Sequence, residues 1–294
     1  MTSKKVVVTG AHSYLGQKLL QFLLNIGGFE IAAFITPWAE TGGLVQGNGI
    51  AYFKADLQKQ LDGEAAEAVR NAERVLHFAW IRGKNEQQVL GENLRMFENL
   101  KEHIARPENL VFISSVAASP ETLSAYGKTK FKMANVLSEY GAIILVTGLI
   151  VDKEPKGPYK LLVSVVKKLP LSVRFTKNSV KVYPIRTDDF LSGILTILTN
   201  PIDGGTYRLF PSDAADINDF LSQLEKKYSR PRLPLPVSYG LSMGTLKLFH
   251  KLHLLPATLG EKLLTFLYKD ENYLSKHGVL PDTEKIDRPL EEMI

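Results

Sequence analysis

The chain of 294 residues contains no cysteine. This absence excludes disulfide bonds, thiolate metal sites and a cysteine nucleophile, and it agrees with a reducing compartment. Long apolar runs are also missing, because the longest one, residues 142–151, is too short to cross a bilayer and contains Thr147 and Gly148. We therefore expect no integral membrane segment. The first five residues leave no room for a signal peptide before the first apolar segment, so the cytoplasm is the expected compartment.

Neither sign of charge is in large excess. The chain has 36 Lys and Arg residues against 31 Asp and Glu residues, which gives a net charge of +5 and an isoelectric point near 9.1. This balance suits an anionic small molecule. The basic residues are dispersed and not interleaved with aromatic ones, so we expect no nucleic acid as a partner. The apolar share of 45% is ordinary for a globular protein, and the length allows a major and a minor domain.

A strand, a glycine turn and a helix follow one another near the N-terminus. Residues 6–8 are three consecutive valines, which predict a strand buried on both faces, as inside a parallel sheet. Gly10 allows a tight turn out of this strand, and Gly16 allows the following helix to lie close to the sheet. The amide groups and the dipole at the start of such a helix favour a phosphate. This order predicts a dinucleotide site formed by Gly10, His12, Ser13, Tyr14, Leu15 and Gly16.

Two parts of this expected site are unusual. Ser13 occupies the place of the middle glycine and leaves less room for a phosphate beside the backbone. The expected second strand, residues 30–35, is followed by Thr36, Pro37 and Trp38, at the position where a carboxylate would hold an adenosine ribose. These three residues carry no charge that would bind or repel a 2′-phosphate. NAD and NADP therefore both remain open as the cofactor.

Strands and helices alternate through the first half of the chain. Further strands are expected at residues 50–54, 74–79, 110–115 and 142–147, with helices at residues 86–103 and from residue 124 onward. This alternation predicts an α/β protein with a doubly wound parallel sheet. We expect this cofactor-binding core to span residues 1–152.

The rhythm changes after residue 152. Residues 153–294 are expected to form a smaller mixed α/β part that binds the substrate, with parts of residues 179–210 packing back onto the core. The expected elements are helices at 159–168, at 187–198 and after Asp216, with strands at 171–175, 180–186 and 206–210. Residues 233–294 predict two or three amphipathic helices interrupted by prolines.

Three residues form a candidate catalytic group. Tyr126 and Lys130 are four residues apart in an expected helix, so they lie on one face, one turn apart. A tyrosine has an ordinary pKa of about 10, and a neighbouring ammonium lowers it toward the range useful for proton exchange. Ser115 ends an expected parallel strand, where it can donate a hydrogen bond to the oxygen of a substrate carbonyl. A solvated helix face is the simpler explanation of the pair alone, but the order behind a glycine turn favours catalysis.

These motifs together resemble the extended branch of the short-chain dehydrogenase/reductase superfamily, the NAD-dependent epimerases and dehydratases. The resemblance covers about residues 5–220 and is weaker at residues 278–281. Its motifs are Thr9-Gly10-Ala11 with Gly16, Asp56-Leu57, Leu76 to Ala79, Asn93, Phe112 to Ser115, Tyr126 with Lys130, Val146 to Val151, and Arg186 to Asp189. The family's usual arginine and proline are replaced by Val146 and Thr147.

The resemblance implies a Rossmann fold with a smaller C-terminal subdomain, and roles for particular residues. Tyr126 would be the general acid/base, Lys130 would tune its pKa and bind the ribose, and Ser115 would bind the carbonyl. The cofactor would be NAD or NADP, and no metal is expected. Besides the glycine turn, the implied cofactor contacts are Asp56, Leu57, Phe78, Ala79, Trp80, Asn93, Lys130, Leu149 and Val151.

Departures from the family narrow the expected reaction. In the 4,6-dehydratases an Asp-Glu pair follows the catalytic residue, whereas Val116 and Ala117 stand here and cannot carry a proton. The absence of cysteine excludes the subgroups that epimerise through a thiol. A 4-epimerase or a keto-sugar reductase remains, acting on a nucleotide diphosphate sugar. The residues expected at the substrate are Arg82, Val116, Arg174 and Arg186.

Two other functions remain open. A reductase of a non-sugar carbonyl compound would use the same catalytic group. A non-catalytic NAD(P)-binding scaffold or sensor would keep the fold and explain Ser13, Val146 and Thr147, although the intact pair of Tyr126 and Lys130 counts against it. A homodimer is a possible assembly.

Overall fold

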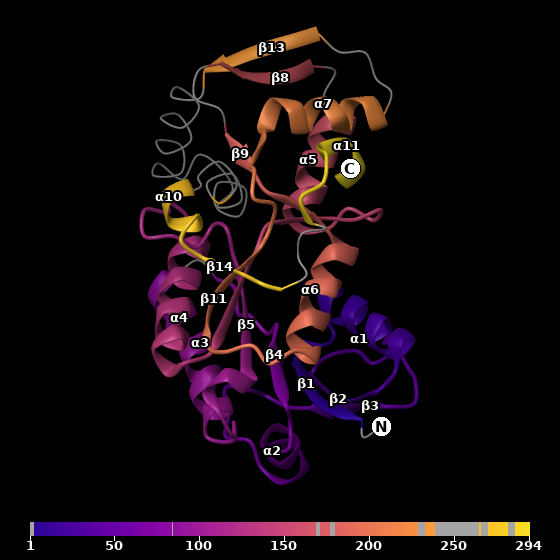
Figure 1. The fold of residues 1–294 in the computed structure, drawn as a ribbon, viewed down its shortest axis with the longest axis vertical. Helices are drawn as coiled ribbons and strands as arrows, with labels where there is room; N and C mark the ends of the chain where they lie inside the picture. Colours follow the sequence, from indigo (N-terminus) through magenta and orange to yellow (C-terminus); the bar gives the residue numbers. More distant parts are fainter. Residues whose placement is uncertain are drawn as a thin grey trace. The chain divides into compact units, whose positions relative to one another are not determined.

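The computed structural model describes residues 3–83, 85–168, 171–176, 180–228, 233–238, 265, 270–281 and 286–294 (Figure 1). The chain packs into two compact units. The first comprises Met1–Ser114, Thr129–Leu145 and Ile197–Tyr207, and the second comprises Ser115–Lys128, Val146–Thr196 and Arg208–Ile294. Each unit is thus assembled from stretches that are far apart in the sequence. The division into residues 1–152 and 153–294 stays a prediction.

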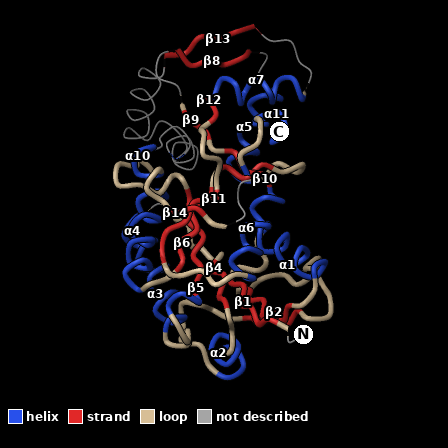
Figure 2. Tube along the Cα trace, viewed as in Figure 1, coloured by secondary structure: helices blue, strands red, loops and turns tan. Residues whose placement is uncertain are grey.

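The main sheet of the described residues has eight strands in the order β14-β11-β6-β5-β4-β1-β2-β3. Its strands are β1 (Lys4–Thr9), β2 (Phe29–Ile35), β3 (Ile50–Lys54), β4 (Arg74–His77), β5 (Leu110–Ser115), β6 (Ile143–Thr147), β11 (Gly205–Leu209) and β14 (Gly278–Val279). β1 pairs in parallel with β2 and β4, β2 with β3, and β4 with β5. Figure 2 shows β1, β2, β4 and β5 among the red strands of this sheet. The expected doubly wound parallel sheet is therefore confirmed.

Buried apolar residues explain why the N-terminal elements form. Val6, Val7 and Val8 of β1 are almost completely buried, as a central parallel strand requires. In α1 (Tyr14–Ile26) the buried residues include Leu19 and Leu23, which lie on one helical face. The other helices that begin in the first 130 residues are α2 (Gly63–Arg70), α3 (Glu86–Lys101) and α4 (Ala125–Tyr140), with a short 3₁₀ helix, η1 (Pro107–Asn109). The sequence does not predict α2, which is short and has only Ala66 and Val69 buried.

Three short strand pairs lie in the described part of the second unit. β7 (Leu149–Val151) pairs in parallel with β10 (Pro184–Arg186), β9 (Lys181–Val182) pairs in antiparallel fashion with β12 (Ala215–Asp216), and β8 (Leu171–Thr176) pairs in parallel with β13 (Leu233–Ser238). The single strand predicted at residues 180–186 is wrong, because Tyr183 separates two strands with different partners. The strand β13 lies where only helices are predicted. Its prolines, Pro234 and Pro236, alternate, so the missing N–H groups point to one side of a strand that pairs on the other.

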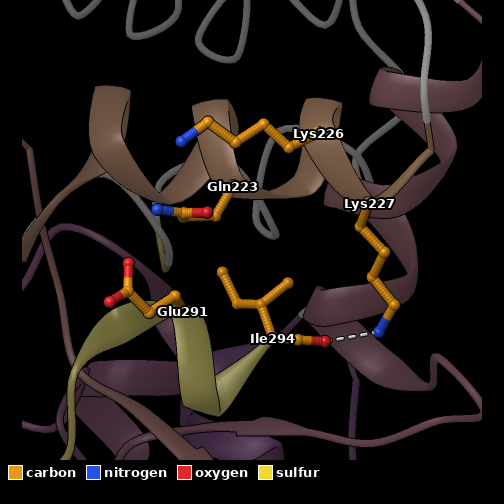
Figure 3. A pocket seen from close by; sticks show the side chains of 5 residues that line it. All are labelled: Gln223, Lys226, Lys227, Glu291 and Ile294. Atoms are coloured by element: carbon orange, nitrogen blue, oxygen red, sulfur yellow. Dashed lines mark hydrogen bonds between the residues drawn. The ribbon is translucent and has the colours of Figure 1, made fainter.

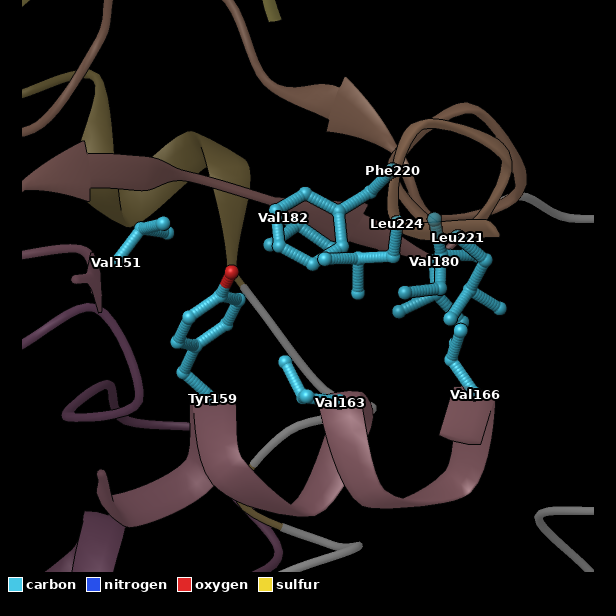
Figure 4. Close-up of a cluster of buried hydrophobic side chains, with 10 residues drawn as sticks. Val151, Tyr159, Val163, Val166, Val180, Val182, Phe220, Leu221 and Leu224 are labelled. Atoms are coloured by element: carbon cyan, nitrogen blue, oxygen red, sulfur yellow. The ribbon is translucent and has the colours of Figure 1, made fainter. Parts of the chain in front are cut away.

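Two helices of the second unit, α5 (Gly157–Lys168) and α7 (Ile217–Lys227), pack around an apolar core. The other helices described after α5 are α6 (Thr187–Thr199), α10 (Glu271–Leu274) and α11 (Leu290–Met293). Tyr159 and Val163 of α5 point toward Phe220 and Leu224 of α7 in Figure 4, and all four are buried. The rings of Tyr159 and Phe220 meet edge to face with their centroids 6.4 Å apart. Most of the further helices predicted after residue 233 fall on 239–264 and 266–269, outside the described residues.

Within the described part of the chain, no helix combines the length and the apolar character needed to cross a bilayer.

Candidate active site

Two glycines shape the turn between β1 and α1. Gly10 has a φ of +65°, which favours glycine, and a Cβ there would lie only 2.8 Å from the backbone nitrogen of Ala79. A Cβ at Gly16 would lie 2.7 Å from the carbonyl oxygen of Ala11. Any side chain at either position would collide with backbone atoms. The turn therefore needs glycine for close packing at both of the predicted positions.

Ser13 has a local role that explains why it replaces a glycine. Its φ is −69°, an ordinary value for a non-glycine residue, and it is the N-cap of α1. The Ser13 hydroxyl accepts a hydrogen bond of 3.1 Å from the amide of Gly16. This bond turns the side chain back onto the helix end. The first-turn amides and the positive helix dipole still form an end that suits a pyrophosphate, so the described residues fit a dinucleotide.

Thr9 joins the glycine turn to the end of β4. Its hydroxyl lies 2.8 Å from Nδ1 of His77 and accepts a hydrogen bond of 3.2 Å from the amide of Ala79. Burial lowers the pKa of His77 to about 3, and the nearby Lys130 charge adds to the effect. His77 is therefore neutral at physiological pH. Because β4 ends at His77, the prediction of a strand through Ala79 is wrong, and Phe78 and Ala79 belong to a loop.

Asn93 holds the continuation of this loop. Its Oδ1 accepts a hydrogen bond of 3.0 Å from the amide of Ile81, and its Nδ2 donates to the carbonyl oxygens of Ile81 and Val89. Asn93 is completely buried. Its amide thus fixes the loop that carries Phe78, Ala79, Trp80 and Arg82.

Lys130 is buried among polar and aromatic groups. Its Nζ donates a hydrogen bond of 2.7 Å to the carbonyl oxygen of Ile113 and lies 3.9 Å from the ring centroid of Trp80 and 4.3 Å from that of Phe112. Burial lowers the pKa of Lys130 well below its usual value, and the Arg82 guanidinium lowers it further. The carbonyl and the two ring faces offer partial compensation to the charged form. The contacts bring together Lys130 and Trp80, two of the predicted site residues.

Asp56 and Leu57 directly follow β3 at the carboxyl edge of the parallel strands. Oδ1 of Asp56 accepts a hydrogen bond of 3.1 Å from the amide of Gln58, so the carboxylate stabilises a short turn. Leu57 is buried, and its carbonyl oxygen accepts a hydrogen bond from Asn99.

Ser115 ends β5, and the chain then folds against the start of α4. The amide of Ala117 donates a hydrogen bond of 3.2 Å to the Ser115 hydroxyl. A Cβ at Gly127, the residue after Tyr126, would lie 2.4 Å from the carbonyl oxygen of Ala117. The amide of Gly127 is also bonded to the Ser124 hydroxyl at 3.0 Å. The segment after Ser115 is thus packed directly on the helical turn that carries Tyr126.

The sequence alone does not predict the roles of Ser124 and Gly127. A signal was present, because a glycine in the first turn of a helix often marks a close backbone approach.

The residues that follow β6 belong to the second unit, where hydrogen bonds hold their backbone in place. The amide of Val116 donates to the carbonyl oxygen of Thr147. The amide of Leu149 donates to Tyr183 at 2.7 Å, and the carbonyl oxygen of Val151 accepts from the Thr187 hydroxyl. These bonds fix the backbone of three predicted site residues.

Two of the three arginines predicted for substrate binding, Arg174 and Arg186, have carboxylate partners. Arg174 forms a two-pronged ion pair with Glu225 of α7, with its shorter N–O distance at 2.6 Å. Nη2 of Arg186 lies 3.3 Å from Oδ2 of Asp188. A substrate phosphate would compete with these carboxylates, so the predicted role of Arg174 requires the Glu225 pair to open.

Two cavities lie along α7, and none of the predicted site residues lines them. The first, of about 320 Å³, is lined by Gln223, Lys226, Lys227, Glu291 and Ile294 (Figure 3). The second, of about 390 Å³, extends over Ala214, Ala215, Asp216, Asp219, Ser222, Gln223, Lys226 and Leu290. Both are open surface features between α7 and the C-terminal segment. The residues that the sequence motifs identify as a site do not line either of them.

Solved structures match the fold, although no protein-family model matches the chain and no curated protein matches it significantly by sequence. A nucleoside-diphosphate-sugar epimerase from Staphylococcus aureus is 14% identical, covers 99% of this chain and 98% of its own, and has a TM-score of 0.70. A UDP-glucuronic acid 4-epimerase from Bacillus cereus, solved with NAD, is 20% identical over 79% of this chain and 85% of its own, with a TM-score of 0.60.

A third match is DesIV, a dTDP-glucose 4,6-dehydratase from Streptomyces venezuelae solved with NAD and TYD. It is 14% identical over 79% of this chain and 84% of its own, with a TM-score of 0.60. These three neighbours are two sugar-nucleotide epimerases and one dehydratase, and two of the three were solved with NAD. At these identities the likeness confirms the expected fold.

Proposed function

We propose that this protein is an NAD(P)-dependent epimerase or reductase of the extended short-chain dehydrogenase/reductase type, acting on a nucleotide diphosphate sugar. The fold that it shares with nucleotide-sugar epimerases supports the proposal. The observation that carries it furthest is the packing of the segment after Ser115 on the turn of α4 that holds Tyr126, with Gly127 leaving no space between them. This packing supports a serine and a tyrosine acting on one substrate oxygen.

Each member of the catalytic group has a defined task in this proposal. Tyr126 exchanges a proton between its phenolic oxygen and the substrate hydroxyl, and Ser115 donates a hydrogen bond to the same substrate oxygen. Lys130, one turn further along α4, stabilises the phenolate by its charge. When bound, the nicotinamide would supply hydride chemistry at one sugar carbon.

The remaining predicted residues divide into cofactor contacts and positioning residues. The turn at Gly10, Ser13 and Gly16 would hold the pyrophosphate, and Asp56 with Leu57 would border the adenosine. We assign Asn93 a positioning role, because its amide is already bonded to Ile81 and Val89.

Dehydration is a less suitable reaction for this chain, although a 4,6-dehydratase shares the fold. Elimination of water requires side chains that can donate and accept a proton next to the catalytic serine. Val116 and Ala117 occupy those positions and are buried. Reduction, or oxidation followed by reduction, at one carbon needs only the tyrosine as a proton carrier.

The cofactor bound to the purified protein separates an epimerase from a reductase. Denaturation should release NAD or NADP that remains oxidised after incubation with substrate if the protein is an epimerase, because each turnover regenerates the cofactor. Consumption of added NADH or NADPH in proportion to product indicates a reductase. A protein that binds no dinucleotide in calorimetry would overturn both versions of the proposal.

The tyrosine is tested by Tyr126→Phe. The substrate for this test is a UDP-sugar or dTDP-sugar that raises the melting temperature of the protein. We expect the turnover of this substrate to fall by about 10²-fold or more, since loss of a general acid/base typically lowers the rate by about 10²–10⁴-fold. The dissociation constant of NAD should stay within about twofold, because the ring remains. Tyr140→Phe on the same helix is the matched control and should leave turnover unchanged. Full activity of Tyr126→Phe would remove the proposed mechanism.

A further inference from the structure

The chain lacks the usual means of holding adenosine at the end of β2. A carboxylate at this point would hydrogen-bond to the ribose, and a cation would bind a 2′-phosphate. Thr36, Pro37 and Trp38 stand there instead. The Thr36 hydroxyl oxygen is buried and has no hydrogen-bond partner among the described residues, so it faces the protein and not a ligand on the surface. The end of β2 therefore offers no ribose or 2′-phosphate ligand to supplement Asp56 and Leu57, which border the adenosine in the proposed function.

The strand register places the residues after β2 beside the dinucleotide turn. Phe34 pairs with Thr9 of β1, and Ile35 pairs with Lys54 of β3. Gly10 and Asp56 therefore lie just beyond the two neighbouring strands at the same carboxyl edge. The amide of Ala39 bonds to the carbonyl oxygen of Thr36 at 2.9 Å. This turn carries Trp38 just beyond the end of β2, at the same carboxyl edge of the sheet as the glycine turn and Asp56.

Trp38 is unusual for a large aromatic side chain, because 70% of its surface is exposed. Exposure alone says little, since single apolar side chains are common on protein surfaces. The position of Trp38 gives the exposure its meaning, because this largely exposed indole follows β2 at the carboxyl edge of the sheet, where the adenosine of a dinucleotide would lie. Aromatic side chains stack on nucleobases through their faces, and neither partner needs a charge.

We propose that Trp38 binds the adenine of the cofactor by stacking, and that base stacking replaces ribose recognition in this chain. The inference rests on the proposed dinucleotide-dependent function. Trp38 is a specificity-determining residue in this proposal: it selects ligands that carry a nucleobase and is indifferent to the 2′-phosphate. The loss of Trp38 should therefore lower the affinity for NAD and the affinity for NADP by the same factor.

The tryptophan content of the chain gives a direct spectroscopic test. The chain has two tryptophans, and only Trp38 is strongly exposed, because Trp80 lies under Lys130. Acrylamide quenching of tryptophan fluorescence in the wild-type protein should report mainly on Trp38. Saturating AMP should protect this fluorescence at least about twofold, whereas ribose 5-phosphate, which lacks the base, should not. Trp38→Phe should abolish the protection, because this variant lacks the fluorophore that AMP shields.

Calorimetry with NAD and NADP provides the second test. Trp38→Ala should raise the dissociation constants of both NAD and NADP by about tenfold or more. Trp38→Phe keeps an aromatic face and should stay within about threefold of the wild type. Both variants should melt at the wild-type temperature, since the side chain is exposed.

The outcomes separate this inference from the proposed function. If wild-type protein binds NAD and Trp38→Ala binds it equally well, the inference is wrong and the proposed function stands. Protection by ribose 5-phosphate equal to that by AMP would also overturn the stacking. If the wild type binds neither NAD nor NADP, the proposed function fails and the inference fails with it.

Discussion

Gly127 shows how a single missing side chain shapes the candidate site. The space beside its Cα is filled by the Thr122 hydroxyl and by the carbonyl oxygen of Ala117, at 2.3 and 2.4 Å from where a Cβ would stand. A backbone carbonyl cannot move aside as the end of a flexible side chain can. The close approach therefore couples the geometry of Tyr126 to that of the loop after Ser115.

Replacement of Gly127 by alanine tests this coupling at the residue scale. We expect Gly127→Ala to lower the free energy of unfolding by about 1–3 kcal/mol through overpacking and to reduce turnover. Gly91→Ala is the matched control, because Gly91 lies in α3 and no described atom comes within 4 Å of its added Cβ. That control should raise stability by about 0.5–1 kcal/mol from helix propensity. Urea unfolding measures both, and equal effects would contradict the close packing.

At the scale of elements, α2 and α7 both have an aspartate as their N-cap residue but use it differently. Asp216 caps α7, and its Oδ1 accepts a hydrogen bond of 2.8 Å from the amide of Asn218. Asp62 precedes α2 but makes no side-chain capping bond within the described structure. Both are good N-cap residues by type, so only their geometry separates them.

This difference predicts unequal effects of the same substitution. Asp216→Ala should lower the free energy of unfolding by about 1 kcal/mol, because one amide at the start of α7 loses its partner. Asp62→Ala should change it by less than about 0.5 kcal/mol. Thermal unfolding of the two variants makes the comparison, and an equal loss for Asp62→Ala would show that the cap of α2 forms in solution.

At the scale of the whole molecule, a neutral histidine in the core links stability to pH. Burial lowers the pKa of His77 to about 3 in the folded protein, whereas an unfolded chain has the ordinary value near 6.5. Between these values the unfolded state binds more protons than the folded state. The free energy of unfolding therefore falls as the pH drops from about 6.5 toward 3.

The contribution of His77 can be isolated by His77→Gln, which cannot titrate. The wild-type free energy of unfolding should fall by up to about 1.4 kcal/mol per pH unit below pH 6.5 on account of this residue. The variant should show a slope that is smaller by that amount. Denaturant titrations between pH 4 and pH 7 give the slopes, and identical profiles for wild type and His77→Gln would refute the assignment.

The elements of the main sheet could be predicted closely because their signals are local. The strand at residues 110–115 has the predicted bounds, and the helix predicted from residue 86 begins there. Each depends on an apolar period and on nearby turn residues. The strand at 233–238 was not predictable in the same way, since two prolines disfavour a strand unless a neighbour such as β8 pairs with it.

In the candidate site, too, some features follow from local sequence signals and others depend on tertiary contacts. Glycine spacing and the four-residue interval between Tyr126 and Lys130 are written in the sequence, and they predict the fold and the class of chemistry. The burial of Lys130 against Trp80 and Phe112 depends on three elements meeting in space. The predicted homodimer, substrate arginines and catalytic roles stay predictions.

The order of residues by itself determined the parallel sheet, the glycine turn and the helix that carries Tyr126, because these follow from short-range backbone preferences and apolar periodicity. Only the tertiary structure decided that Asn93 holds a loop, that Arg174 faces Glu225, and that Trp38 stays in solvent. Such pairings join residues that are distant along the chain, and their free energy depends on close packing and burial, which no local pattern encodes.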